Sequence, residues 1–333
     1  MAILAIETSC DETSVAILES GHVLSNAVSS QIDIHKEYGG VFPEVASRLH
    51  VENINFVIKE ALKKADRGFD DIDYIAVTQG PGLIGSLHIG VMAAKALAFS
   101  LDVPLVPVHH IIGHIYANEL SGTMTYPLLA LVVSGGHTEL VYMASEFQFE
   151  VIGQTQDDAV GEAYDKVARQ MGLSYPGGPI IDKLSKEGKP NYKLPEVKLE
   201  NPLDFSFSGL KSAVRQLMLR EERHQRDIIL EDLAYAFQES ATDELLKRVK
   251  LALNTYDIKT LVLAGGVAAN SCLRDKISNL SSTYEDLNIL IPPLWACMDQ
   301  AAMIGLAAKH YIERKMYGSC EISAVSNKPI ETY

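Results

Sequence analysis

The sequence predicts an α/β protein built from two lobes, because strand and helix patterns alternate along the chain and the alternation then starts again. Its 333 residues are enough for two lobes of ordinary domain size, each with its own hydrophobic core. Aromatic residues make up 7% of the chain, so the cores are expected to consist mainly of Ala, Val, Ile and Leu. That mix suits parallel strands that are covered by helices on both faces.

The N-terminal region predicts the strands and helices of one α/β lobe. Three short apolar runs joined by turns predict a strand meander, and two stretches of apolar residues at helical spacing predict helices. A proline at the start of the first of these stretches suits a first helical turn. The predicted strands are 3–7, 14–18, 23–29, 72–78 and 103–108, and the predicted helices are 43–65 and 86–101.

The pattern restarts in the second half of the chain. The strand, small polar turn and returning strand at 128–143 repeat the arrangement of 3–18, which indicates a duplication of architecture, since the residues themselves do not match. Two such units that face each other would place both polar turns at one cleft. The later elements are a mostly helical region at 157–253, strands at 261–264 and 287–291, a helix that begins near 268, a closing helix at 298–316 and a tail after 318 that is expected to be poorly ordered.

The charge balance limits how the protein binds its partners. Lys and Arg number 29 against 43 Asp and Glu, so the formal net charge is −14. This is the wrong sign for a protein that holds nucleic acid by general electrostatics. If RNA is the substrate, a local basic patch or a partner protein must supply much of the attraction.

Cysteine usage and the N-terminus predict a reduced, cytoplasmic enzyme. The four cysteines form no C-x-x-C pair and suggest neither a disulfide framework nor a cysteine-based zinc site. The N-terminus lacks the positive region and the long apolar run of a signal peptide. The most apolar stretch, 82–101, is interrupted by His88 and Lys95, so we expect a buried helix there and no membrane span.

The pair His110 and His114 is the most specific local signal for chemistry. Four residues apart on a helix, the two imidazoles share one face and can reach one divalent metal, with a distant carboxylate as the third ligand. The alternative is a pair of histidines that face solvent or cap a helix end. Ile111 follows His110, so the glutamate of the metallopeptidase pattern H-E-x-x-H is absent, which weighs against a protease.

Two glycine-rich segments follow predicted strands and indicate sites for phosphate or adenosine. In the turn SGGHT, at 134–138, glycines let backbone N–H groups approach phosphate oxygens, although an ordinary hairpin turn explains the same residues. In LVLAGGVAAN, at 261–270, a strand runs into two glycines and a helix start, which suits an adenosine pocket or a phosphate at a helix N-terminus. The dinucleotide pattern G-x-G-x-x-G is not met.

Several acidic residues lie where they could bind substrate or accept a proton. Asp11 and Glu12 occupy the first turn, where either could take a proton in a closed cleft or simply face solvent. Asp165 and Asp182 lie on predicted helices, where they could form ordinary helix pairs or contact a phosphate or ribose. Asp299 begins the closing helix, a position that the helix dipole also favours for a carboxylate.

Taken in order, these segments resemble one family. The chain is similar to the TsaD family, the bacterial tRNA N6-adenosine threonylcarbamoyltransferases formerly described as O-sialoglycoprotein endopeptidases, in the segments IETSCDETSVA, QGPGL, HHIIGH, VVSGGHTEL, GEAYDKVAR, YPGGP, FSFSGLK, LAGGVAAN and CMDQAAMIG. The match runs from residue 3 to about residue 309, in family order and spacing. The resemblance implies the two-lobed actin-like fold of sugar kinases, Hsp70 and actin (ASKHA) with a central cleft, and lobes at 1–108 with 300–333 and at 109–299.

The resemblance also implies the site residues. One divalent metal, Fe²⁺ ahead of Zn²⁺, would bind His110, His114 and Asp299. Asp11 and Glu12 match the acidic pair near the reacting end, and we expect one of them to accept the proton. The expected substrate-binding residues are Val132, Val133, Ser134, Gly135, Gly136, Asp165, Gly178, Asp182 and Asn270.

Two residues depart from the family pattern beside the implied metal ligands. His109 stands where the family often has Asn, and it adds an imidazole that competes for the metal. Gln300 stands where Asn is common after the metal aspartate. Neither change removes a ligand.

The implied reaction transfers the threonylcarbamoyl group from threonylcarbamoyl-AMP to the exocyclic amine of the adenine 3′-adjacent to the anticodon in tRNAs that read ANN codons, which forms t6A and releases AMP. The implied partners are tRNA, a TsaB-like paralogue and a TsaE-like ATPase. The alternatives are an ATP-dependent phosphotransferase or ATPase of the same fold, a carbamoyltransferase for another acceptor, and a noncatalytic scaffold. A phosphotransferase of this class needs no histidine pair, and a scaffold needs none of the three metal ligands.

Overall fold

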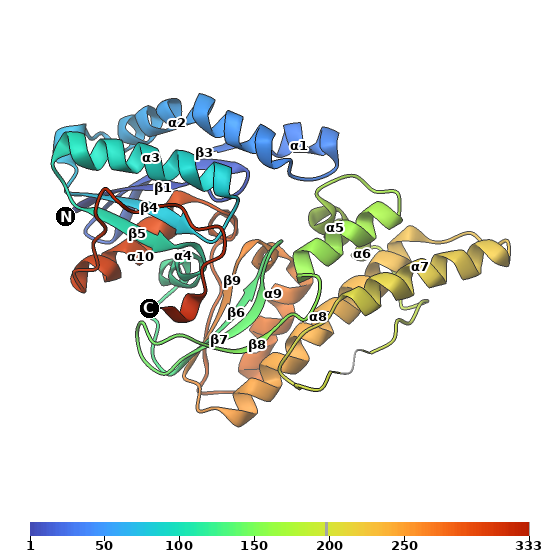
Figure 1. The fold of residues 1–333 in the computed structure, drawn as a ribbon. Coiled ribbons are helices and arrows are strands. Elements are labelled where there is room, and N and C mark those ends of the chain that lie inside the picture. Colours follow the sequence, from blue (N-terminus) through green and yellow to red (C-terminus); the bar gives the residue numbers. More distant parts are fainter. Residues whose placement is uncertain (197–198, 333) are drawn as a thin grey trace. The chain divides into compact units, whose positions relative to one another are not determined.

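The computed structural model describes residues 1–196 and 199–332, which form two compact units (Figure 1). Unit 1 comprises Met1–Leu120 and Trp295–Thr332, so the chain enters this unit twice. Unit 2 comprises Ser121–Leu294. Each unit contains one five-stranded sheet, as expected for two α/β lobes.

The boundaries of these units differ from those of the expected lobes. Residues 109–120 and 295–299 were expected in the second lobe, but they lie in unit 1. The physical reason is that helix α4 (His110–Tyr116) packs against helix α10 (Ala301–Glu313) and follows directly on the last strand of unit 1. All three expected metal ligands therefore belong to the same unit.

Unit 1 is built on a five-stranded sheet with helices on both faces (Figure 1). Its strands are β1 (Ala2–Glu7), β2 (Glu12–Glu19), β3 (His22–Ser30), β4 (Tyr74–Gly80) and β5 (Leu105–His109), and its further helices are α1 (Ile32–Tyr38), α2 (Pro43–Ala65) and α3 (Ile84–Leu101). The strand order is β3-β2-β1-β4-β5, with β1 antiparallel to β2 and parallel to β4. Helices α2 and α3 cover one face, and α10 covers the other.

The main core of unit 1 lies between the sheet and helices α2 and α3. Leu4 and Ile6 of β1 point to the same face because strand side chains alternate, and they pack with apolar residues from both helices. Helix α2 occupies the predicted range 43–65, with Pro43 in its first turn. Among the described helices, α3 alone has the length and hydropathy for a membrane span, which is weak evidence because core helices have the same properties, and α3 packs on β4 and α2.

Unit 2 repeats this arrangement. Its strands are β6 (Leu128–Val133), β7 (Thr138–Met143), β8 (Glu150–Gln154), β9 (Thr260–Ala264) and β10 (Asn288–Leu290), and its helices are α5 (Val160–Gln170), α6 (Gly177–Ser185), α7 (Ser208–Arg223), α8 (Leu230–Thr255) and α9 (Ser271–Ser278). The strand order is β10-β9-β6-β7-β8, with β6 antiparallel to β7 and parallel to β9. Strand β6 thus has the neighbours that β1 has in unit 1, which confirms the expected duplication of architecture.

The structure also differs from the sequence-based elements in places. Helix α1 and strand β8 were not predicted, and the closing helix begins at Ala301 and not at residue 298. The helix expected near residue 268 is a 3-10 turn followed by α9. The described 3-10 helices are Phe69–Asp71, Ala117–Leu120, Gly266–Ala269, Asn279–Ser282, Leu294–Ala296 and Ile330–Thr332.

The expectation of a poorly ordered tail is wrong for the described residues after 318. The N–H of Gly318 donates to the carbonyl oxygen of Leu105 at 2.8 Å, and the N–H of Val325 donates to that of Gln79 at 2.9 Å. The tail therefore runs along the ends of β4 and β5 in unit 1. Main-chain hydrogen bonds hold it there, and these leave no periodic pattern of side chains in the sequence.

Candidate active site

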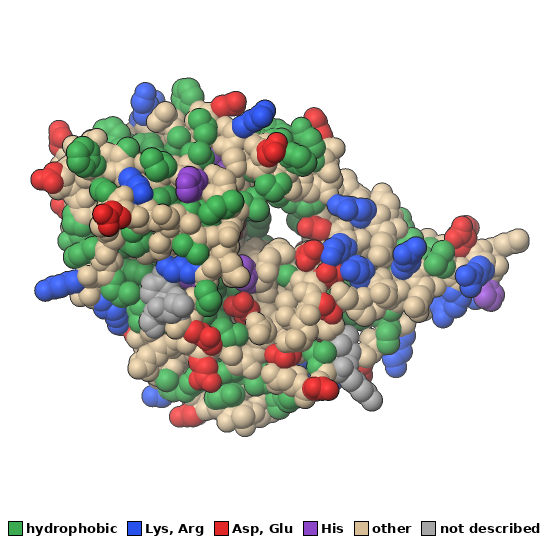
Figure 2. Space-filling view, viewed as in Figure 1, with side chains coloured by type: hydrophobic (Ala, Val, Ile, Leu, Met, Phe, Trp, Pro, Cys, Tyr) green, Lys and Arg blue, Asp and Glu red, His purple; other side chains and the backbone are tan. Residues whose placement is uncertain are grey.

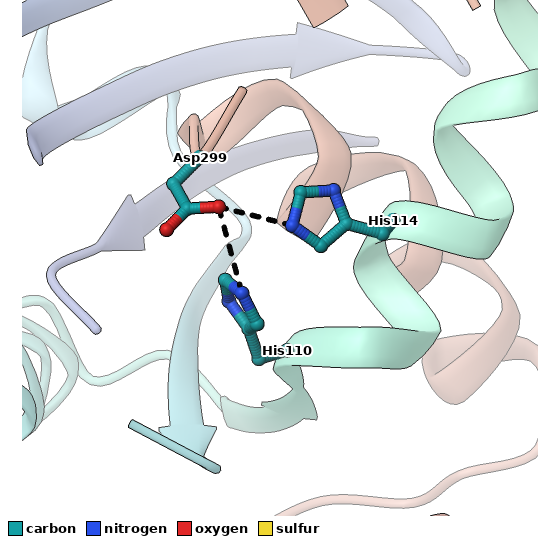
Figure 3. A group of neighbouring side chains, drawn as sticks. All are labelled: His110, His114 and Asp299. Atoms are coloured by element: carbon teal, nitrogen blue, oxygen red, sulfur yellow. Dashed lines mark hydrogen bonds and ion pairs between the residues drawn. The ribbon is translucent and has the colours of Figure 1, made fainter. Parts of the chain in front are cut away.

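Three potential cation ligands converge in unit 1, as Figure 3 shows. His110 and His114 lie one turn apart on α4, and Asp299 lies in the segment that precedes α10. The Oδ1 atom of Asp299 lies 3.0 Å from Nε2 of His114 and 3.6 Å from Nε2 of His110. The two histidines are buried, and the side chain of Asp299 is 23% exposed, so the cluster keeps a route to solvent.

The geometry of this cluster fits a divalent cation. A metal that binds imidazole nitrogen and carboxylate oxygen at about 2.0–2.2 Å requires ligand atoms about 3–3.5 Å apart. The ligand atoms of the three residues all lie within 4.8 Å of one another, so small side-chain rotations bring them to that spacing. The three residues would supply three ligands to such a cation and would leave room for substrate or water beside it.

The sequence did not point to Glu7, which lies against the cluster. Glu7 is the last residue of β1 and is fully buried, and its Oε2 atom lies 3.2 Å from Nδ1 of His110. Burial would lower the pKa of His110, but the charges of Asp299 and Glu7 and the hydrogen bond to Glu7 raise it to about 9. Burial would likewise raise the pKa of Glu7, but the facing His110 lowers it on balance. The imidazolium of His110 offsets the charge of these carboxylates, and a cation at this cluster would take over that role.

The remaining imidazoles of this region have distinct environments. Among the described residues, Nδ1 of His114 is buried without a hydrogen-bond partner. His109 does not join the cluster as a competing ligand: its Nδ1 accepts from the N–H of Ile111 and caps α4, and its Nε2 donates to the carbonyl oxygen of Lys328 at 2.8 Å. Both ring nitrogens of His109 are therefore engaged in holding the start of α4.

The acidic pair Asp11 and Glu12 lies in the same unit and is buried. Burial, and then the charges of Asp11 and Asp299, raise the pKa of Glu12 well above its ordinary value. His50 of α2 supports this turn, because its Nε2 donates to the carbonyl oxygen of Cys10 at 2.9 Å and its Nδ1 accepts from the hydroxyl of Thr13 at 2.8 Å. The solvated turn that was the alternative is excluded. His50 itself was missed, because a histidine in the middle of a helix has no sequence signal for such a contact.

The expected substrate loop forms the turn between β6 and β7 in unit 2. Val132 and Val133 are fully buried in β6, whereas Gly135 and Gly136 are exposed. The Oγ atom of Ser134 accepts hydrogen bonds from the N–H groups of Gly136 and His137, at 3.2 and 2.9 Å. A Cβ atom added to Gly135 or Gly136 would meet nothing within 4 Å. The turn is thus open to a ligand, although the N–H of Gly136 already donates to the hydroxyl of Ser134.

The other expected substrate residues are connected through unit 2. Asp165 of α5 accepts a hydrogen bond from the N–H of Gly177, next to Gly178, at the start of α6. Burial raises the pKa of Asp165, and the hydrogen bonds from the α6 N-terminus oppose this shift. Asp182 of α6 accepts from the hydroxyl and the N–H of Ser271, at 2.8 and 3.2 Å.

Asn270 completes this set at the start of α9. Its Oδ1 accepts from the N–H of Leu273, so Asn270 caps the helix, and its Nδ2 donates to Gln238 at 2.8 Å. The structure therefore links Asp165, Asp182 and Asn270 through the N-termini of α6 and α9. Helix N-termini of this kind attract phosphate groups.

The fold and the site define an actin-like α/β protein with a histidine–aspartate cation cluster. Solved structures of the same fold include HypF of T. kodakarensis, with a TM-score of 0.59 and 14% identity over 97% of this chain and 50% of that chain. Component A of the Acidaminococcus fermentans (R)-2-hydroxyglutaryl-CoA dehydratase has a TM-score of 0.54 and 14% identity over 94% of this chain and 99% of that chain. These similarities confirm the predicted actin-like fold.

The sequence assigns the chain to one family of this class. The sequence model of the family TsaD, tRNA N6-adenosine threonylcarbamoyltransferase, matches residues 22–306. The tRNA N6-adenosine threonylcarbamoyltransferase of Bacillus anthracis is 54% identical over 331 residues, which cover 99% of this chain and 96% of the relative. The protein of that name from Staphylococcus haemolyticus is also 54% identical, with the same coverage. The chain belongs to the TsaD family.

Proposed function

We propose that this protein transfers the threonylcarbamoyl group from threonylcarbamoyl-AMP to the exocyclic amine of the adenine 3′-adjacent to the anticodon in tRNAs that read ANN codons. The products are t6A in tRNA and AMP. The observation that carries this proposal is the convergence of His110, His114 and Asp299 in a chain that is 54% identical to transferases of this name over nearly its full length. A phosphotransferase of the same fold does not require that cluster.

His110, His114 and Asp299 hold one divalent cation in this proposal, Fe²⁺ ahead of Zn²⁺, since both metals accept imidazole and carboxylate ligands. When bound, the cation supplies a Lewis acid that polarises a carbonyl oxygen of the threonylcarbamoyl group. The cap that His109 forms on α4 fixes the start of the helix that carries both histidines, so this helix is in place before the substrate binds.

The acidic pair serves as the proton acceptor. The amine nitrogen forms a bond with the carbamoyl carbon, the bond from that carbon to the phosphate oxygen breaks, and AMP leaves with the electron pair. The amine must lose a proton in this exchange. Glu12 suits this role, because a carboxylate with a raised pKa is a stronger base than an ordinary one.

Unit 2 supplies the contacts to the adenylate. The turn with Ser134, Gly135 and Gly136 is open, and Val132 and Val133 anchor it in the sheet. The N–H of Gly136 already donates to Ser134, so the N–H of Gly135 is the one expected to approach the phosphate first. The substrate phosphate or ribose is expected at the helix starts held by Asp165, Gly178, Asp182 and Asn270.

Partner proteins complete the system in the cytoplasm. Helices α2 and α3 carry large apolar side chains that are at least half exposed, and Figure 2 shows hydrophobic surface over these helices. An apolar face of this kind suits a permanent protein partner, and we assign it to the TsaB-like paralogue, with a TsaE-like ATPase as a further member of the complex. The residues are Val51, Phe56, Ile84, Met92 and Phe99.

The tRNA must bind in spite of the net charge of −14. The part of α7 from Arg215 onward and the segment after it carry exposed arginines, and Figure 2 shows basic side chains at this tip of unit 2. Arg220 and Arg226 also pair with Glu221, at 3.0 and 3.7 Å. Guanidinium groups recognise phosphates, so this tip supports a share in tRNA binding. The residues are Arg215, Arg220, Arg223 and Arg226.

A reconstituted reaction tests the proposed function. The purified chain, with a TsaB-like and a TsaE-like protein, is incubated with threonylcarbamoyl-AMP and unmodified ANN-decoding tRNA, and the nucleosides are analysed by mass spectrometry. The His110→Ala/His114→Ala double variant is compared with His22→Ala, which removes an exposed histidine on β3. We expect t6A from the wild type and His22→Ala and none from the double variant.

The other outcomes are equally informative. If the double variant also forms t6A, the reaction stands but the cation cluster is not part of it. If no variant forms t6A while a positive-control enzyme is active in the same mixture, the proposed function is wrong and the phosphotransferase alternative becomes the one to test.

A further inference from the structure

The carboxylate of Glu7 is the most deeply buried acidic group of unit 1 that the proposed reaction does not use. Glu7 is fully buried at the end of β1. An ionised carboxylate without partners is very costly in such a place, so its hydrogen bonds indicate why it is there.

Three groups from three segments donate to this carboxylate. The N–H of Ser9 donates to Oε1 at 2.5 Å, and the hydroxyl of Thr78 on β4 donates to Oε2 at 2.5 Å. The third contact joins Oε2 to Nδ1 of His110 at 3.2 Å. The first two contacts fix the plane of the carboxylate, and the third directs one of its oxygens at the ring of His110.

This arrangement determines which nitrogen of His110 is available to a cation. The hydroxyl of Ser9 also lies 3.2 Å from Nδ1 of His110, and a hydroxyl can either donate or accept. An ionised carboxylate only accepts hydrogen bonds, so the contact with Glu7 requires a proton on Nδ1, and the hydroxyl of Ser9 then acts as a second acceptor. The lone pair then lies on Nε2, which is the nitrogen that faces Asp299 at 3.6 Å. In metal sites, carboxylates that accept from the second ring nitrogen fix the tautomer and raise the basicity of the ligand.

We propose that Glu7 is a positioning residue of the cation site, which holds His110 as the Nδ1–H tautomer with Nε2 directed at the cation. The proposal rests on the cation site of the proposed function. His114 has no counterpart to Glu7, since its Nδ1 has no hydrogen-bond partner among the described residues. His110 is therefore the ligand whose tautomer the protein sets through its second ring nitrogen.

The affinity for Co²⁺, measured by competition with a chelator at fixed pH, tests this role without any substrate. Glu7→Gln keeps the volume of the side chain but replaces one acceptor oxygen by an N–H₂ group, so it cannot satisfy all three donors. We expect Co²⁺ to bind about 10–100-fold more weakly to Glu7→Gln, with an altered Co²⁺ absorption spectrum. Thr78→Val is the matched control, because it removes a hydrogen bond to the same carboxylate without touching the imidazole.

We expect Thr78→Val to lower the melting temperature of the metal-free protein but to keep the Co²⁺ affinity within about threefold of the wild type, since Glu7 keeps its contact with His110. An equal loss of affinity in both variants would show that Glu7 only supports the fold, and unchanged affinity in Glu7→Gln would also overturn the proposal. If the wild type binds no Co²⁺, the cation site itself fails, which is a separate result.

A second measurement needs no variant, in case Glu7→Gln does not fold. In the Zn²⁺-loaded wild type, ¹H–¹⁵N NMR of the labelled histidine rings reports which nitrogen of His110 carries the proton. We expect a protonated Nδ1 in slow exchange with solvent, because that N–H is buried against Glu7. A protonated Nε2 would contradict the proposal.

Discussion

The two units share one sheet topology but differ in the turn that follows the first strand. In unit 1 the turn between β1 and β2 is buried and ends in Asp11 and Glu12, beside the cation cluster. In unit 2 the turn between β6 and β7 contains Gly135 and Gly136 and is exposed. The same scaffold thus presents carboxylates at one turn and open main chain at the other, which suits a cation and an anion respectively.

A close backbone contact behind each turn is common to both units. A Cβ atom on Gly82, after β4, would lie 2.6 Å from the carbonyl oxygen of Ser9, and a Cβ atom on Gly265, after β9, would lie 2.4 Å from that of Val133. In each case the glycine lets two neighbouring strand ends approach. The duplication has therefore kept the packing that places the turn, while the residues of the turn have diverged toward different chemistry.

Removal of the acids from the first turn is expected to have the largest effect. In the Asp11→Asn/Glu12→Gln double variant, turnover should fall by about 10²–10⁴-fold, because the proton acceptor is lost. Folding should be retained. The pKa of Glu12 is raised in the folded state, so the ionisation of this carboxyl destabilises the folded protein as the pH rises through that pKa. Removal of the charge should therefore leave the melting temperature at pH 7 unchanged or higher.

The pH profile of the wild type sharpens this test. The base must be ionised to accept a proton, so kcat/KM should rise with pH through a pKa above that of an ordinary glutamate, and this limb should be absent from the residual activity of the double variant. Intact turnover in the double variant would refute the role of both acids.

The features that could be predicted from the sequence are those that a local pattern of residues marks. Helix α2 was predicted with its observed bounds because Pro43 and the apolar period mark it locally. The spacing of His110 and His114 likewise shows a shared helix face. Asp299 was assigned only through the family resemblance, because its contact with His114 spans 185 residues of sequence.

Other features of the site depend on contacts that have no local pattern. Glu7 ends an apolar strand and resembles an ordinary strand boundary, and its partners Thr78 and His110 lie 71 and 103 residues away. The observed boundary between the two units differs from the predicted boundary between the lobes, because α4 packs on α10 and so joins segments that are distant in the sequence. Such contacts follow from the assembled fold and not from periodicity.

Substitution of Gly265, which packs against the strand before the β6–β7 turn, is expected to have the next largest effect, and this effect is a loss of stability. Gly265 has φ of +92°, and an added Cβ would collide with the main chain of Val133. Gly265→Ala should destabilise the protein by about 2–4 kcal/mol, because both the left-handed backbone and the collision have a cost. Thermal unfolding measures this loss, with Gly172→Ala as the matched control, since Gly172 also has a positive φ, +74°, but no neighbour within 4 Å. Equal destabilisation by both substitutions would show that backbone strain alone matters.

Substitution of Gly136, an exposed glycine of the β6–β7 turn, should change the stability of the free protein least. A Cβ atom on Gly136 meets nothing within 4 Å, so Gly136→Ala should change the free energy of unfolding by less than about 0.5 kcal/mol. If the main chain of this turn approaches the phosphate of threonylcarbamoyl-AMP, however, the methyl group should raise KM for this substrate about tenfold, which corresponds to about 1.4 kcal/mol. Steady-state kinetics with saturating tRNA measures the effect. An unchanged KM would mean that the second turn, although open, does not contact the adenylate, and the contrast between the two units would then be one of structure alone.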